Sequence, residues 1–332
     1  MRANVHLRDG LRIELDSGET VVADGRRPAG DINVLSHAHG DHLYRQAPAA
    51  LVCSELTAAL ARRRRDEATA GRPARTTHPS VDLLDAGHVA GSQAARIEDE
   101  AADVTYLYTG DISTRDRFYL SGFEPPDADV LIVETTYGEP GYVFPPQDEL
   151  EAEIVDWLDD TLDRPVLLFG YSLGRAQKLQ LLVERSERSR LYVSDAIACI
   201  NAVVETALDV DFGAERSGPD TELAPGDALV LPTQTSKLAF VENIVESTGA
   251  VKAGFSGWAV EESFKYRGDY GATFPLSDHC DFNELTAVVE AVDPEIVYTH
   301  HGSAEEFATH CTGNLGYEAR TLKRNQTALG DF

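Results

Sequence analysis

The pattern of apolar and polar positions predicts short strands through residues 1–140. Apolar runs at 11–15 and 20–23 lie on either side of the turn-forming residues 16–19, which is typical of a hairpin. Residues 54–70 have a helical pattern, with Ser54 in the position of an N-cap. Further strands are expected at 81–84, 104–109 and 130–133. Each of these ends at, or is followed directly by, a polar or ionisable residue, where the sites of layered α/β folds usually lie.

From residue 147 the rhythm changes to alternating helices and strands. Helices are expected at 147–162, 173–185, 196–208 and 236–247, and strands at 165–169, 191–193 and 227–231. After residue 255 strands return, followed by a helix at 283–292 and a strand at 295–298. The order predicts an α/β fold with a small parallel α/β domain inserted into a larger one. We place the larger domain at 1–145 and 256–332 and the inserted domain at 146–255.

The charge of the chain is strongly unbalanced. Of the 332 residues 42% are hydrophobic, enough for a large core, while 56 acidic side chains face 29 basic ones for a net charge of −27. We interpret this excess as a surface adapted to strong salt and expect a halophilic source; an ordinary acidic protein is the alternative. Such a chain repels nucleic acid at low salt, so a polyanion site would depend on metal ions and a few local arginines.

The four cysteines form no C-x-x-C pair, so neither a zinc ribbon nor a redox motif is predicted. They are typical of reduced thiols. No signal-peptide segment and no apolar run of membrane-spanning length is visible. We therefore expect a cytoplasmic protein without membrane association.

The strongest chemical signal lies directly after the apolar run 32–35. His37, His39, Asp41 and His42 place four metal-ligating side chains within six residues. Alternation puts the first three on one side of an extended segment, and His42 reaches the same site if the chain bends. Imidazoles and carboxylates suit zinc, and the number of ligands makes two metals plausible. The alternative is a coincidental cluster on a solvated turn.

Two later residues extend this candidate site. His88 follows the strand at 81–84, and Asp111 follows the strand at 104–109. A single histidine or a single strand-end aspartate is more often structural. Their order after the histidine-rich motif indicates instead further metal ligands, with Asp111 able to bridge two ions.

With Asp24, these residues resemble the metallo-β-lactamase superfamily. The resemblance implies an αβ/βα sandwich with a two-metal site at the edge where the two sheets meet. Three further segments resemble the β-CASP nucleases within that superfamily: 133–138, 277–281 and 299–302. Residues 168–179 resemble the start of the β-CASP insert.

The narrower likeness covers residues 24–302. Residues 111–146 are most similar to bacterial DNA-ligase-associated exonucleases, and the chain also resembles archaeal mRNA 3′-end processing proteins. The resemblance implies two Zn²⁺ ions, with Mn²⁺ as an alternative. The implied metal ligands are His37, His39 and His88 for the first ion, Asp41, His42 and His301 for the second, and Asp111 between them. Asp24 would orient a ligand, and His300 competes with His301 for the last position.

Two more residues carry implied catalytic roles together with Asp41. His279 would protonate the leaving oxygen, with Glu134 as its partner. Histidine suits this work because its ordinary pKa lies near neutral pH. The motif around His279 is weak alone, and the alternative is a structural histidine in a loop.

Substrate contacts are expected at a strand-to-helix turn. Backbone amides near Ser172 and Gly174, with Arg175 beside them, could hold a phosphate. An ordinary turn is an equal alternative. Trp258 could stack a base, although a core aromatic is favoured, and the arginines at 62–65 more often form one solvated helix face.

The function predicted from these residues is a two-zinc phosphodiesterase acting on single-stranded nucleic acid or overhangs by metal-activated hydroxide. A DNA exonuclease in repair or end processing is favoured, with a DNA ligase in the same pathway. An RNA-processing nuclease is the first alternative. A small-molecule metallohydrolase for thioesters or lactones is the second, and a non-catalytic binding protein is a third.

Overall fold

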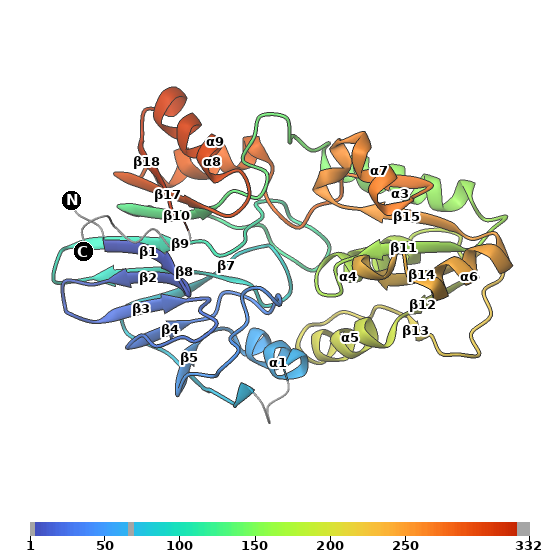
Figure 1. Ribbon diagram of the computed structural model, residues 1–332, viewed down its shortest axis with the longest axis horizontal. Helices are drawn as coiled ribbons and strands as arrows, with labels where there is room; N and C mark the ends of the chain where they lie inside the picture. Colours follow the sequence, from blue (N-terminus) through green and yellow to red (C-terminus); the bar gives the residue numbers. More distant parts are fainter. Residues whose placement is uncertain (1–3, 66–69, 324–332) are drawn as a thin grey trace. The chain divides into compact units, whose positions relative to one another are not determined.

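The computed structural model describes residues 4–65 and 70–323, which form two compact units (Figure 1). Unit 1 comprises Met1–Arg115, Ser121–Gly141 and His279–Phe332, and unit 2 comprises Asp116–Leu120 and Tyr142–Asp278. The sequence predicts the second boundary at 255/256. The structure places it later because strand β16 (Ala272–Phe274) pairs in parallel with β15 (Val251–Phe255) and so completes the sheet of unit 2.

Unit 1 is built on two six-stranded sheets. The first has the order β1 (Asn4–Arg8), β2 (Gly10–Glu14), β3 (Thr20–Ala23), β4 (Ile32–Val34), β5 (Ala50–Val52), β6 (Ala74–Thr76). The second has the order β18 (Glu318–Thr321), β17 (Ile296–His300), β10 (Val130–Glu134), β9 (Val104–Tyr108), β8 (Gln93–Asp99), β7 (Val81–Asp85). The predicted hairpin is the antiparallel pair β2–β3, in which Leu11 lies opposite Ala23.

The two sheets share one hydrophobic core. Ile13 and Val21 of the first sheet pack in the same cluster as Ile97 and Ile132 of the second. The outer face of the second sheet is covered by helices, because Leu131 of β10 clusters with apolar side chains of α8 (Phe282–Val292) and α9 (Ala304–His310). Helix α1 (Glu55–Arg64) follows β5, and the Ser54 hydroxyl accepts the backbone N–H of Thr57 as an N-cap. The predicted α/β sandwich is confirmed, while the end of the predicted helix, 66–69, lies outside the described residues.

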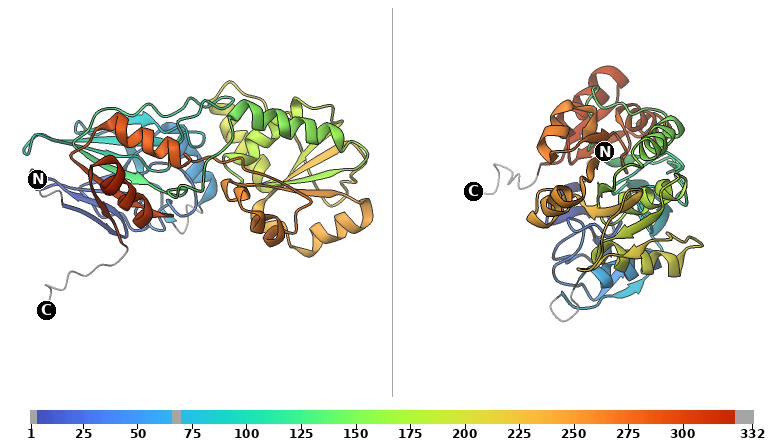
Figure 2. Two further views of the ribbon diagram at one scale, coloured as in Figure 1. Left: turned by 90° about the horizontal axis from the view of Figure 1, so that it is seen from above. Right: turned by 90° about the vertical axis from the view of Figure 1, so that its right-hand side faces the viewer.

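Unit 2 is a parallel sheet with helices on both faces, as Figure 2 shows. Its strands have the order β13 (Glu215–Arg216), β12 (Arg190–Val193), β14 (Asp227–Pro232), β11 (Val166–Gly170), β15, β16. Its helices are α3 (Gln147–Asp160), α4 (Arg175–Glu184), α5 (Asp195–Ala207), α6 (Ala239–Thr248) and α7 (Glu262–Gly268). Side chains of α3, α4 and α5 cluster on one face, and those of α6 and α7 on the other. The predicted parallel α/β insert is confirmed in its element order.

Among the residues that the structure describes, no helix has the length and apolar character needed to cross a membrane.

A buried ionic network lies within unit 2. The Asp278 carboxylate is fully buried, accepts a hydrogen bond from Lys178 Nζ, and lies 3.0 Å from Arg175 Nη2. The Arg117 guanidinium donates to the backbone carbonyls of Ser277 and Asp278. Burial alone would raise the pKa of Asp278, but Lys178, Arg175 and Arg117 together hold it well below its usual range. The carboxylate is therefore ionised, and it compensates cations that have no access to water.

We expect Asp278→Asn to destabilise unit 2 by about 3–5 kcal/mol, because it leaves buried cations uncompensated. Both tryptophans of the chain, Trp157 and Trp258, lie in unit 2, so urea denaturation followed by tryptophan fluorescence reports on this unit. The exposed Asp220→Asn is the matched control and should stay within about 0.5 kcal/mol of wild type. Equal midpoints for the two variants would contradict the role of Asp278.

Candidate metal centre and catalytic site

The segment after β4 carries the histidine-rich motif into the interior of unit 1. His37 is fully buried and His42 is 2% exposed. The backbone N–H groups of His42 and Leu43 both donate to the His39 carbonyl, at 3.2 and 3.1 Å. This turn bends the chain after His39, so His42 returns to the side on which His37 lies, as the sequence analysis requires.

Two glycines shape the loops that bring His88 and Asp111 to the same place. Gly87 and Gly110 have left-handed backbone angles, with φ of 66° and 56°. A Cβ on Gly110 would lie 2.6 Å from the Ser36 Cβ, and a Cβ on Gly87 would lie 2.2 Å from the Ser113 carbonyl oxygen. Only glycine fits both the conformation and the space at these positions.

Three imidazole nitrogens converge on one carboxylate oxygen. Asp111 Oδ2 lies 3.5 Å from His37 Nε2, 3.5 Å from His42 Nε2 and 3.6 Å from His88 Nε2. These distances are too long for hydrogen bonds. Among the described residues, no hydrogen-bond partner exists for His37 Nε2, His42 Nε2 or Asp111 Oδ1. Unpaired donor atoms that surround a common centre are what a buried metal site requires.

Asp111 takes part in three of the candidate metal-binding groups of the described residues, and the third pairs it with Glu134 and His279. Atoms of His37, His39, His88 and Asp111 lie within 4.8 Å of one another, and those of His42, Asp111 and His301 do so as well. Neutral imidazoles with one carboxylate match the preferences of zinc and similar ions. The residues present therefore fit a metal centre, and the shared carboxylate allows for two ions.

The electrostatics of the cluster favour bound positive charge. Burial and the neighbouring imidazoles, His42 foremost, lower the pKa of His37 far below its usual range, so its ring is neutral and can act as a ligand. Burial alone would also lower the pKa of His42, but the Asp111 and Asp24 carboxylates raise it to about 10. A position that stabilises a proton so strongly also favours a cation in its place.

Asp24 contacts the segment that carries the histidine-rich motif, residues 36–42. Its Oδ2 lies 2.8 Å from His42 Nδ1 and accepts hydrogen bonds from the hydroxyls of Tyr108 and Ser36, while its Oδ1 accepts the Ser36 backbone N–H. The Ser36 hydroxyl also contacts His37 Nδ1 at 2.9 Å. These contacts direct Nε2 of both imidazoles toward Asp111.

An orienting role for Asp24 is expected from the sequence, whereas Ser36 and Tyr108 are not. Only their positions in the sequence could have indicated these two residues. Ser36 directly precedes His37, and Tyr108 lies three residues before Asp111 on the strand that leads to it. Asp24 itself has a φ of 52°, a left-handed conformation that is uncommon for a residue other than glycine and is often found at functional sites.

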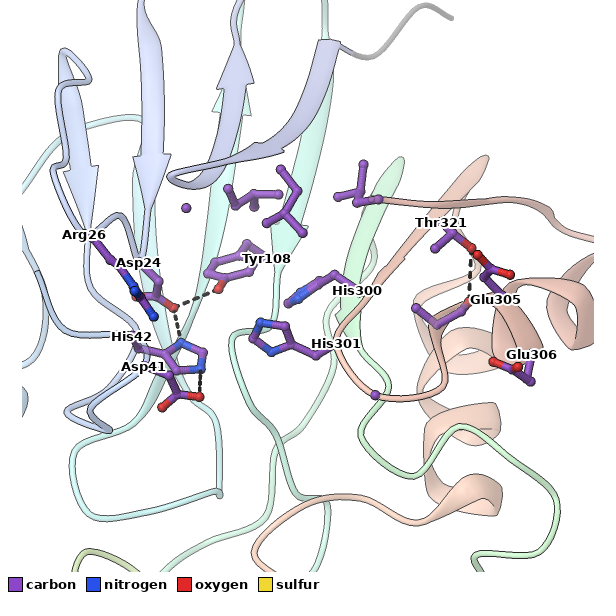
Figure 3. A pocket seen from close by; sticks show the side chains of 16 residues that line it. Asp24, Arg26, Asp41, His42, Tyr108, His300, His301, Glu305, Glu306 and Thr321 are labelled. Atoms are coloured by element: carbon purple, nitrogen blue, oxygen red, sulfur yellow. Dashed lines mark hydrogen bonds and ion pairs between the residues drawn. The ribbon is translucent and has the colours of Figure 1, made fainter. Parts of the chain in front are cut away.

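The two adjacent histidines after β17 have different surroundings. His301 has a φ of 60° and groups with His42 and Asp111. Its ring lies 5.6 Å from that of His42, and Figure 3 shows both. His300 belongs to none of the metal-binding groups found among the described residues. Burial, together with the neighbouring His301, lowers the pKa of His300 to about 3, so its ring is neutral.

His279 and Glu134 form a pair at the edge of the cluster. His279 Nδ1 lies 2.8 Å from Glu134 Oε1, and the His279 ring lies 4.5 Å from that of His88. Glu134 is fully buried, which alone would raise its pKa. The adjacent His279 and the hydrogen bond from the Thr136 N–H lower that pKa to about 2, so Glu134 is ionised and fixes the imidazole.

The residues after His279 anchor it to unit 1. The Cys280 N–H donates to the Ile112 carbonyl at 2.9 Å. Asp281 is the N-cap of α8 and forms a capping box with Glu284. Arg115 makes ion pairs with both of these carboxylates. The segment that carries His279 is therefore fixed on both the loop side and the helix side.

The remaining predicted ligand, Asp41, lies at the rim. Its side chain is 72% exposed and its Oδ2 lies 3.9 Å from His42 Nε2. Arg65 donates to the carbonyls of Gly40 and Leu43, on either side of Asp41 and His42. One arginine of the basic run thus supports the ligand loop rather than a solvated face.

The predicted substrate contacts lie in unit 2. The Gly174 N–H is taken by the Gln177 side chain at 2.7 Å, and Gly174 has a φ of 99° at the start of α4. Arg175 is buried, pairs with Asp278 and donates to the Phe255 carbonyl. Ser172 is half-buried. A phosphate role for these residues stays a prediction, and Arg175 has in addition the structural task described above.

We expect Asp24→Asn to weaken metal affinity about 10- to 100-fold, because the uncharged amide no longer fixes the His42 ring as the carboxylate does. Competition with a chromophoric chelator measures this directly. Asp82→Asn, a change at a side chain that is 70% exposed on β7, is the control. An Asp24 variant that binds metal as tightly as this control would show that the orienting contacts are dispensable.

The chain is similar in sequence to parts of longer known proteins. No protein-family model matches the chain. A probable DNA ligase of Opitutus terrae is 35% identical over 306 residues, which cover 89% of this chain and 29% of that protein. An RNase J-like protein of Methanocaldococcus jannaschii is 30% identical over 118 residues, 34% of this chain and 28% of that protein. The chain thus spans less than a third of either relative.

A likeness to a solved structure supports the fold. The crystal structure of a protein of unknown function from Enterococcus faecalis matches with a TM-score of 0.58 at 13% identity, covering 90% of this chain and 81% of that chain. The same family is indicated by the sandwich, by its inserted α/β unit, by the order of the candidate ligand residues and by the relatives. The chain belongs to the metallo-β-lactamase superfamily and, within it, to the β-CASP family.

Proposed function

We propose that the chain is a metal-dependent nuclease that hydrolyses phosphodiester bonds in single-stranded nucleic acid or overhangs. The observation that carries this proposal is the placement of the His279–Glu134 pair against the convergent ligand cluster. A ring that lies 4.5 Å from the His88 imidazole is within reach of a group bound at the cluster.

The ligand residues would hold the metal. His37, His39 and His88 would hold one ion, Asp41, His42 and His301 a second, and Asp111 both. A pair of zinc ions, or manganese in their place, would supply Lewis acidity and a water of lowered pKa. Asp24 and Ser36 keep the imidazoles oriented in this arrangement.

His279 would deliver a proton to the leaving oxygen. Its Nδ1 is occupied by Glu134, so the proton comes from Nε2. The ionised Glu134 stabilises the imidazolium form and holds the ring during the transfer. The small-molecule alternative needs neither of these residues, which supports the nuclease over the thioester or lactone hydrolase.

DNA is the favoured polymer. The relative matched over 89% of the chain is named a probable DNA ligase, whereas the RNase J-like relative is matched over 34%. A nuclease that trims DNA ends before a ligase seals them fits this likeness, so we propose a DNA exonuclease of repair or end processing with a DNA ligase as its partner in the pathway. RNA processing is the alternative that the RNase J-like relative supports.

The net charge of −27 adds a condition on the reaction. At about 1 M salt the Debye length falls to about 3 Å, so a nucleic acid can approach this acidic protein. We therefore propose a halophilic source. The assays therefore belong in molar KCl.

We expect His279→Ala to lower kcat about 10²- to 10⁴-fold on a nucleic-acid substrate while metal content stays unchanged, because only proton delivery is lost. Metal content by mass spectrometry and single-turnover cleavage measure the two effects separately. His6→Ala, an exposed change on β1, is the control. A His279 variant as active as this control would remove the general-acid role.

Cleavage of end-labelled DNA and RNA of matched sequence, with Zn²⁺ or Mn²⁺ and an Asp41→Ala control, tests the function itself. Linear DNA shortened from one end, with no cleavage by the control, is the expected result, and EDTA should abolish it. Cleavage of RNA alone would move the protein to RNA processing. A metal-loaded protein that cuts neither polymer would favour the small-molecule hydrolase.

A further inference from the structure

A cavity of about 440 Å³ lies beside the second ligand group (Figure 3). Asp41, His42 and His301 border it, and all of its lining residues belong to unit 1. The volume falls within the range of about 300–1,000 Å³ that is typical of small-ligand sites. The metal-binding residues account for only one side of this space.

His300 is the residue of the cavity that the metal centre leaves unexplained. It is 2% exposed and lines the cavity, and neither ring nitrogen has a hydrogen-bond partner within the described part of the chain. Burial of a polar group without a partner is unfavourable. A neutral imidazole offers one donor and one acceptor, so this position suits a ligand with both kinds of group.

The other walls combine apolar faces with exposed carboxylates. Leu7, Leu11 and Leu322 line the cavity together with Tyr108, whose ring lies nearly parallel to that of His300 at 5.8 Å and 29°. Glu305 and Glu306, both exposed, lie on the α9 side of the cavity in Figure 3. Apolar walls suit the faces of a nucleobase, and carboxylates accept hydrogen bonds from the hydroxyls of a sugar.

We propose that this cavity holds the nucleoside of the terminal nucleotide, with the phosphate of that nucleotide against Asp41, His42 and His301. This inference rests on the proposed exonuclease function and assigns to the terminal nucleoside a place beside Asp41, His42 and His301. A cavity of this size suits one nucleoside, whereas an internal residue would need the strand to continue through it. Hydrolysis breaks the bond between the phosphorus of the terminal nucleotide and the 3′ oxygen of the preceding nucleotide. Water adds across that bond, so a deoxynucleoside 5′-monophosphate is released and the shortened strand keeps a 3′-hydroxyl.

Binding of deoxyadenosine 5′-monophosphate to the zinc-loaded protein, measured by calorimetry in molar KCl, tests the proposal. Inorganic phosphate is the reference ligand. Leu7→Trp fills the cavity from β1, and His6→Trp is its matched control, because adjacent residues of a strand point to opposite faces and His6 is exposed. We expect Leu7→Trp to weaken nucleotide binding about tenfold or more and to leave phosphate binding unchanged, and His6→Trp to match wild type.

His300→Phe is the second variant, and it keeps the proposal testable if the Leu7→Trp protein does not fold. Phenylalanine retains the ring and removes both nitrogens. We expect weaker nucleotide binding by about tenfold, with unchanged metal content and unchanged phosphate binding. As a further readout, wild-type protein should shorten linear single-stranded DNA and leave circular single-stranded DNA intact.

The outcomes separate this inference from the proposed function. If wild type binds the nucleotide no more tightly than phosphate, or if both substitutions leave nucleotide binding unchanged, the cavity is not a nucleoside site. Cleavage of circular DNA also overturns the restriction to strand ends. Polymer cleavage by wild type alongside any of these results keeps the nuclease, whereas a protein that cuts neither DNA nor RNA loses the nuclease function itself.

Discussion

Asp111 Oδ2 faces three imidazole nitrogens at 3.5 to 3.6 Å without a hydrogen bond to any of them, and the rest of unit 1 is arranged around this contact. Removing a carboxylate and several imidazoles from water is unfavourable unless they bind a cation. Several residues with left-handed backbone conformations lie in the segments that form this cluster. The left-handed conformations of Asp24, Gly110 and His301 all occur in segments that deliver a side chain to it.

Hydrogen bonds to the imidazoles from the surrounding residues fix the orientation of the rings in the cluster. Asp24 accepts three side-chain contacts and a backbone N–H at once, which fixes His42 and, through Ser36, His37. On the other side, the ionised Glu134 fixes His279. His42 and His279 are thus each oriented by a buried carboxylate, and His37 is oriented through the Ser36 hydroxyl.

Local patterns allowed most elements to be predicted. The hairpin, the alternation of helix and strand after residue 147, and the cap at Ser54 depend on neighbours in the sequence, and the structure has them within a few residues. The C-terminal end of the insert was predicted too early in the chain. The pairing of β16 with β15, which extends the insert, is a tertiary contact that local patterns do not reveal.

The candidate site was predictable to the extent that motifs carry it. Spacing brings attention to His37, His39, Asp41 and His42, but it does not reveal which side chains support them. Ser36, Tyr108 and Arg65 act through contacts between distant segments, such as the 84 residues that separate Tyr108 from Asp24. The same limit applies to Arg175, whose sequence position leaves a phosphate contact and an ordinary turn as equal alternatives, while its burial beside Asp278 gives it a structural partner.

The division of the ligands along the chain has a consequence for synthesis. His37, His39, His88 and Asp111 all precede unit 2, whereas His301 follows it. Because a chain emerges from its N-terminus, the first group of ligands is complete before the insert is made, and the second waits until the insert has been traversed. The two groups of candidate ligands therefore become complete at different times during synthesis. Only the arrival of His301, after the whole of unit 2, completes the second group.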